Sequence, residues 1–112
     1  VNMLAKKNRL TSSSDIESVV VRGARAQGNH VVVYHSPSTG GVLRFACVAG
    51  KKVHASAVVR HAVQRKIRAA CRNIVTMREG SCDIVVVART PDIATTPLQA
   101  IISEITKALP SI

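Results

Sequence analysis

The chain has 112 residues, which is enough for one domain and too few for two, so we predict a single domain over 1–112. Its 16 Lys and Arg against 6 Asp and Glu give a net charge of +10, which favours polyanionic partners. No segment approaches the roughly 20 apolar residues that span a bilayer, and the N-terminus lacks the apolar core of a secretion signal, so we expect a cytoplasmic protein.

The first elements expected are a basic arm and a short helix. Residues 1–13 are basic and lack a regular apolar pattern, so we predict an extended N-terminal arm. A serine run then begins a helix, in which Ser14 and Glu17 have capping-box spacing. Gly23 is expected to end this helix in the left-handed conformation. Three aliphatic residues fall on one face of the helix: Ile16, Val19 and Val20.

The middle of the chain predicts strands followed by a long helix. Residues 30–35 are β-branched and aromatic, 36–41 form a hairpin loop, and 42–48 return as a second strand. Residues 51–53 are a candidate third strand. A helix is then expected over 56–74, because its apolar residues recur at helical spacing. This stripe consists of Val59, Val63, Ile67, Ala70 and Ile74.

The last elements expected are a buried strand and a helix. Residues 82–88 are apolar without alternation, which is typical of a strand covered on both faces, often with parallel neighbours. In the final helix, Thr96 and Gln99 have capping-box spacing, Pro97 fits the first turn, and Pro110 ends the helix. Its buried face is Leu98, Ile101, Ile102, Ile105 and Leu109. The expected order is αβββαβα, in an α/β (α+β) two-layer sandwich.

A strongly basic segment carries the functional prediction. Between Arg44 and Arg72 there are eight Lys and Arg and no Asp or Glu. On the long helix, six polar and basic residues fall within an arc of roughly 140°, opposite the apolar stripe: Arg60, His61, Gln64, Arg65, Arg68 and Arg72. Like charges at this spacing repel one another unless an anion lies between them, and guanidinium groups match phosphate oxygens. We therefore favour a nucleic-acid interface over an ordinary solvated face or a membrane-surface helix.

The same segment resembles a known family. Residues 51–68, from Lys51-Lys52 through Ala57-Val58-Val59-Arg60 to Arg65 and Arg68, resemble the signature of the bacterial ribonuclease P protein. That signature reads Lys-Lys, a short spacer, then Ala-Val-x-Arg-Asn-Arg-x-Lys-Arg-x-x-Arg. Residues 4–10, 15–23 and 83–91 resemble the family's arm, first helix, and last strand with its turn. The likeness therefore covers nearly the whole chain.

The resemblance implies a fold and a role. The family fold is αβββαβα with a left-handed crossover at the long helix, which departs from the usual right-handed rule. The implied activity is a ribonucleoprotein endonuclease that removes the 5′ leader of precursor tRNA. Its RNA subunit would hold Mg²⁺ and perform the chemistry. The implied partners are the catalytic RNA and precursor tRNA, with no membrane and no obligatory protein partner.

The resemblance also implies site residues. The RNA contacts fall on Lys51, Lys52, Arg60, His61, Gln64, Arg65, Lys66, Arg68 and Arg72. His61, Ala62 and Gln64 stand where the family has Asn, Arg and Lys, so two positive charges are missing, for which Lys66 and Arg72 could compensate. The leader-binding cleft would be lined by Ile16, Val20 and Tyr34. The family often has aromatic residues at the first two of these positions, which leaves Tyr34 as the stacking candidate, or else as a half-buried strand tyrosine.

Other groupings predict little chemistry. The four histidines show no metal spacing and no nearby acidic partner, so we interpret them as ordinary strand or surface residues. Cys47, Cys71 and Cys82 could approach one another in space, but we interpret them as small core residues with reduced thiols. For Asp83 we favour a structural salt bridge over the alternative of an acidic group near the RNA. A ribosomal or translation-associated RNA-binding protein stays open as an alternative, whereas a freestanding enzyme would need a nucleophile–base pair that the sequence lacks.

Overall fold

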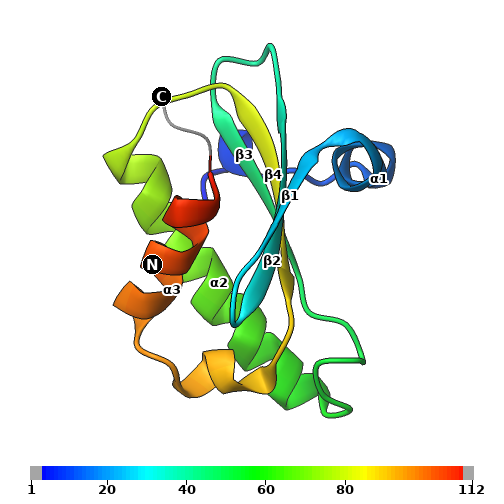
Figure 1. The fold of residues 1–112 in the computed structure, drawn as a ribbon, viewed down its shortest axis with the longest axis vertical. Helices are drawn as coiled ribbons and strands as arrows, with labels where there is room; N and C mark the ends of the chain where they lie inside the picture. The colour runs from blue at the N-terminus through cyan, green and yellow to red at the C-terminus, as the bar shows by residue number, and fades with distance from the viewer. Residues whose placement is uncertain (1–3, 110–112) are drawn as a thin grey trace.

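A computed structural model describes residues 4–109 and contains one four-stranded sheet with helices on both of its faces (Figure 1). The strands are β1 (Ala24–Gln27), β2 (Val31–Pro37), β3 (Leu43–Val48) and β4 (Cys82–Ala88), and they lie in the order β1-β2-β4-β3. Strands β1, β2 and β4 pair antiparallel, and β3 and β4 pair parallel. The expected order αβββαβα is confirmed, and the strands on either side of the long helix are neighbours in the sheet.

One of the three early strands is not the predicted one. Residues 51–53 form a turn in which the Val53 amide donates to the Gly50 carbonyl at 3.0 Å. The additional strand is β1, which lies between the first helix and β2. Its sequence Ala-Arg-Ala-Gln contains no β-branched residue, so its pairing with β2, and not its own propensity, makes it a strand.

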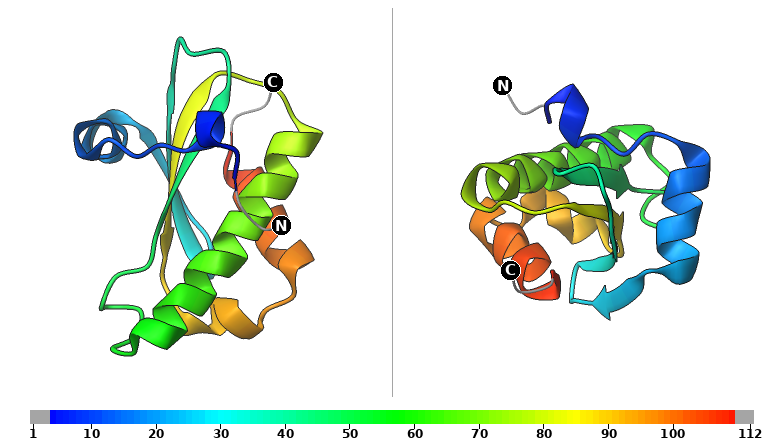
Figure 2. Two further views of the ribbon diagram at one scale, coloured as in Figure 1. Left: turned by 180° about the vertical axis from the view of Figure 1, so that it is seen from behind. Right: turned by 90° about the horizontal axis from the view of Figure 1, so that it is seen from above.

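The long helix α2 (Ala57–Met77) and the final helix α3 (Leu98–Ala108) cover one face of the sheet (Figure 2). The Ser56 hydroxyl caps α2 by accepting from the Val59 amide, and the helix extends three residues past its predicted end. The predicted stripe is buried, except that Val59 is half-buried, and Cys71 joins it. The interior between these helices and the sheet is almost wholly aliphatic, with Phe45 as its one aromatic side chain among the core residues described.

The first helix, α1 (Ser13–Arg22), lies across part of the other face of the sheet (Figure 2). Its cap is Ser12, whose hydroxyl accepts from the Asp15 amide, so the predicted Ser14 capping box is wrong. Gly23 does follow the helix, but with φ −75° it is not left-handed. Glycine is needed there because a Cβ would meet the carbonyl oxygens of Val19 and His35.

The start of α3 also differs from the prediction. Thr96 does not cap the helix, because its hydroxyl donates to the Asp92 carbonyl and closes a 3₁₀ turn at Pro91–Thr95. Pro97 occupies the N-cap position without a side-chain hydrogen bond, so the predicted Thr96–Gln99 box is not formed. The predicted buried face of α3 is confirmed, with Leu98 half-buried, whereas Pro110 lies outside the described residues.

A carboxylate on α3 holds the β1–β2 hairpin. Glu104 accepts hydrogen bonds from the His30 and Val31 amides at 2.9 and 2.8 Å, and its other oxygen lies 2.9 Å from His30 Nδ1. Desolvation raises the pKa of Glu104, but these hydrogen bonds outweigh it, so the pKa lies below its usual value. The prediction that the histidines lack an acidic partner is therefore wrong for His30, since 74 residues separate the pair in sequence.

The described part of the N-terminal arm packs against the sheet. It contains a 3₁₀ turn at Lys6–Asn8, and Leu4 and Leu10 are buried. The Leu10 amide donates to the Phe45 carbonyl at 2.9 Å, and Asn8 Nδ2 donates to the Leu43 carbonyl at 2.8 Å. The arm thus covers the outer edge of β3 instead of extending freely.

Candidate nucleic-acid interface

Burial of the aliphatic face of α2 leaves its basic face exposed to solvent. Val63, Ile67 and Ile74 face the core, so the residues opposite them are exposed to solvent. Four of the predicted residues form this exposed stripe: His61, Arg65, Arg68 and Arg72. No acidic residue occurs in the sequence between Glu17 and Glu79, so α2 carries no negative charge of its own.

Arg60 flanks this stripe and also holds the segment before the helix. Its Nη1 donates to the His54 and Ala55 carbonyls at 3.1 and 2.9 Å. Lys51 and Lys52 are exposed in the turn that opens this segment. Arg60 therefore fixes the path of the chain between the lysine pair and α2, while its Nε and Nη2 donate to no other residue in the described range.

Lys66 does not belong to the exposed stripe. It lies on the flank of α2 next to the segment that leads into α3, where its Nζ donates to the Thr96 carbonyl at 2.8 Å. Gln64 is half-buried on the opposite flank. The structure therefore brings together four of the predicted residues, with Arg60 beside them, and separates Lys66 from the group.

A partly buried ion pair neutralises one of the basic residues on the other face of the sheet. Arg44 donates from Nε and Nη2 to the two Asp83 carboxylate oxygens, at 2.8 and 2.7 Å. This hydrogen bonding raises the pKa of the Arg44 guanidinium despite its desolvation. The expected structural role of Asp83 is thereby confirmed, and Arg44 adds little to the charge available to a polyanion.

Two of the three predicted cleft residues lie between α1 and the sheet. Ile16 and Tyr34 are half-buried and pack around a small cluster formed by Leu10, Val19, Ala46 and Val85. Val20 is 37% exposed and is not part of this cluster. Tyr34 lies opposite Arg25 in the β1–β2 register, so a cation and an aromatic ring share this face. Arg25 was missed because β1 has no sequence signal of a strand.

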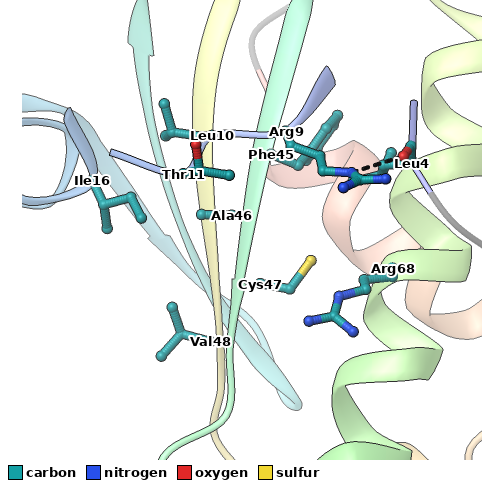
Figure 3. Close-up of a pocket in the computed structure, with 10 residues that line it drawn as sticks. All are labelled: Leu4, Arg9, Leu10, Thr11, Ile16, Phe45, Ala46, Cys47, Val48 and Arg68. Carbon is teal, nitrogen blue, oxygen red and sulfur yellow. Dashed lines mark hydrogen bonds between the residues drawn. The ribbon is translucent and has the colours of Figure 1, made fainter. Parts of the chain in front are cut away.

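A pocket of about 500 Å³ wraps around the edge of β3 and joins the two predicted surfaces (Figure 3). Ile16 and Val48 lie on one side of the strand, and Arg68 and Cys47 lie on the other (Figure 3). Arg9, a residue of the arm, also lines this pocket and donates from Nε to the Leu4 carbonyl at 3.0 Å. Ile16, one of the predicted cleft residues, and Arg68, one residue of the exposed stripe on α2, therefore line the same pocket.

The remaining reactive side chains offer no metal centre. Within residues 4–109, no three His, Cys, Asp or Glu side chains are placed to hold one ion. All three cysteines are free thiols, as predicted, and Cys47 Sγ lies 4.0 Å from Cys71 Sγ. No helix in the described range is long and apolar enough to cross a membrane.

Comparison with known proteins decides the family. The model of the family described as Ribonuclease P matches residues 4–112. This chain belongs to the ribonuclease P protein family. Proteins named ribonuclease P protein component from Mycobacterium bovis and Kocuria rhizophila are both 36% identical to it. The alignments cover 75% of this chain and 72% of the M. bovis protein, and 85% of this chain and 82% of the K. rhizophila protein.

Solved ribonuclease P proteins share the fold. A mutant of the Staphylococcus aureus protein superposes with a TM-score of 0.77 at 22% identity, covering 93% of this chain and 86% of that one. The Thermotoga maritima protein superposes with a TM-score of 0.74 at 20% identity, covering 88% of this chain and 92% of that one. As a ribonuclease P protein, the chain takes part in tRNA processing and has an RNA partner in the holoenzyme.

Proposed function

We propose that this chain binds the catalytic RNA of ribonuclease P through the outer face of α2, and the 5′ leader of precursor tRNA through the cleft between α1 and the sheet. Cleavage is performed by the RNA, in the cytoplasm. The observation that carries this proposal is the exposed stripe on α2, in which His61, Arg65, Arg68 and Arg72 face solvent on a helix that carries no acidic residue. Such a stripe matches closely spaced phosphates on a folded RNA.

The cleft supports contact with a single strand. Tyr34 offers a ring to an unpaired base, and Arg25 lies beside it on β1 to meet the adjoining phosphate. Stacking of a base on an aromatic ring contributes about 1–3 kcal/mol. With Ile16 and Val20 in place of rings, this contact depends on one aromatic side chain and on neighbouring cations.

Mg²⁺ is proposed to be held by the RNA, because the protein surface that meets the RNA is cationic and repels a divalent cation. The protein's contribution is electrostatic: its arginines neutralise phosphates that would otherwise repel one another when the catalytic RNA and its substrate come together. This lowers the Mg²⁺ concentration that the complex needs.

Reconstitution tests this function. A bacterial ribonuclease P RNA and a precursor tRNA are mixed at low Mg²⁺ with and without the chain, and we expect the chain to accelerate removal of the leader. The double variant Lys51→Ala/Lys52→Ala should weaken this stimulation, whereas Lys107→Ala removes an exposed charge from α3 and should leave it intact. Failure of the unaltered chain to stimulate cleavage contradicts the proposal.

A further inference from the structure

Two thiols meet between the edge strand and the basic helix. Cys47 projects from β3 toward α2, and its Sγ lies 4.0 Å from the Sγ of Cys71 on that helix. Cys71 is fully buried, whereas Cys47 is half-buried and lines the pocket at the edge of β3 (Figure 3). A small solute in this pocket can therefore reach Cys47, but it reaches Cys71 only through Cys47.

The charges around the pair distinguish the two sulfurs. The hydrogen bond with Cys71 lowers the pKa of Cys47 in spite of desolvation, and the nearby Arg68 guanidinium lowers it further. Burial instead raises the pKa of Cys71 well above the usual value for a thiol. Cys47 is thus the better nucleophile, and Cys71 remains a protonated thiol in contact with it.

We propose that Cys47 and Cys71 are a redox modification site, in which hydrogen peroxide entering the pocket converts the two thiols into a reversible disulfide between β3 and α2. The Cys47 thiolate attacks one peroxide oxygen, the O–O bond breaks, and the leaving hydroxide takes a proton to give water. The sulfur of Cys71 then attacks the Cys47 sulfenic acid. The S–S bond forms, the S–O bond breaks, and the departing hydroxide takes the Cys71 proton as a second water.

Only a small movement of the two sulfur atoms is needed to form the disulfide. A disulfide has an S–S length of about 2.05 Å, so the sulfurs must approach by roughly 2 Å. Cys47 is packed against the core on one side and borders the pocket on the other, so the approach needs only a small shift of its side chain. The bond would tie α2 to the edge of the sheet three residues after Arg68, which lines the same pocket as Cys47.

Cys82 provides the matched internal control. Cys82 is 8% exposed and lines a separate pocket, and burial raises its pKa. Its Sγ contacts the Asp83 carbonyl at 3.8 Å and has no second sulfur within hydrogen-bonding distance among residues 4–109. It should therefore remain a thiol under conditions in which Cys47 and Cys71 react.

The test treats the reduced full chain with hydrogen peroxide, alkylates the remaining thiols, and maps the peptides without reductant. We expect a mass loss of two hydrogens, a peptide that joins Cys47 to Cys71, alkylated Cys82, and full reversal by dithiothreitol. The oxidised chain should melt on the order of 10 °C higher, because the bond closes a loop of about 25 residues. Cys82→Ser should form the same disulfide.

A second variant identifies the attacking sulfur. In Cys71→Ala, the sulfenic acid on Cys47 cannot be resolved and should be trapped by dimedone, whereas Cys47→Ala should give no dimedone adduct on Cys71. The proposal is overturned if peroxide-treated wild-type chain retains three alkylatable thiols, if it accumulates oxygen on sulfur without an intramolecular cross-link, or if Cys82 enters the disulfide.

Discussion

Two neighbouring cations on α2 should have different roles, one in RNA binding and one in stability. Replacing each of them tests whether the exposed face of α2 binds RNA. Arg65 is exposed and makes no hydrogen bond or ion pair with any other described residue. Lys66 instead donates to the Thr96 carbonyl at 2.8 Å. We expect Arg65→Ala to weaken RNA binding without changing stability. Lys66→Met, which keeps the apolar stem, should lower stability with a smaller effect on RNA binding.

The magnitudes follow from one phosphate contact and one hydrogen bond. Each neutralised phosphate contributes about 0.7 (single strand) to 0.9 (duplex) to the slope of log affinity against log salt concentration. A fourfold rise in salt should therefore narrow the affinity difference between the unaltered chain and Arg65→Ala by about threefold on a folded RNA. Loss of the Lys66 hydrogen bond should cost about 1 kcal/mol, which lowers Tm by roughly 4–8 °C in a domain of this size.

The assay measures the affinity of each variant for ribonuclease P RNA at several salt concentrations with Mg²⁺ held constant, together with thermal melting of the free protein. Lys107→Ala controls for the general loss of one positive charge. Equal changes of slope in Arg65→Ala and Lys66→Met would refute the division of roles, as would a lower Tm in the Arg65 variant alone.

Three further outcomes are expected. Glu104→Gln should lose about 1–2 kcal/mol of stability at neutral pH. Because the pKa of Glu104 is lowered in the folded protein, the ionised carboxylate stabilises the fold above about pH 4.5, and this stability is lost as the pH falls below that value. Chemical denaturation at several pH values, with Glu17→Gln as the control, measures this difference. Tyr34→Leu should weaken binding of leader-bearing precursor tRNA by about tenfold in a titration and leave leaderless tRNA unaffected; equal losses on both RNAs contradict the stacking role. Gly23→Ala should lower Tm by several degrees, because its Cβ meets the backbone carbonyl of His35, and an unchanged melting curve would contradict that close approach.

The sequence predicts best the elements whose own residues determine them. Helix α2 is predictable because Val63, Ile67 and Ile74 recur at helical spacing and are all buried on one face of the helix. The same spacing places the arginines on the opposite, exposed face. Strand β4 was predicted because both of its faces are covered, and the structure places Ile84 and Val85 in two different clusters. In each case the pattern of buried residues lies within one segment, so the local sequence is enough to predict the element.

The errors arise where a distant segment decides the outcome. β1 is a strand because β2 pairs with it, and Glu104 meets His30 across 74 residues. The serine run does begin α1, but the cap is Ser12 and not the predicted Ser14. Lys66 shares the charge of Arg65, yet the segment before α3 supplies it with a carbonyl acceptor. None of these partners is visible in a local window of sequence.

The insertion of β4 between β2 and β3 has a consequence for how the protein is made. β2 and β3 follow one another in the chain but do not pair, and both pair with a strand synthesised more than thirty residues later. A nascent chain that stops before Cys82 therefore has a gap at the centre of its sheet, and α2 has no continuous surface on which to bury its aliphatic side. Helix α2 should reach its final position only after the ribosome has made β4, which delays binding of RNA until synthesis is nearly finished.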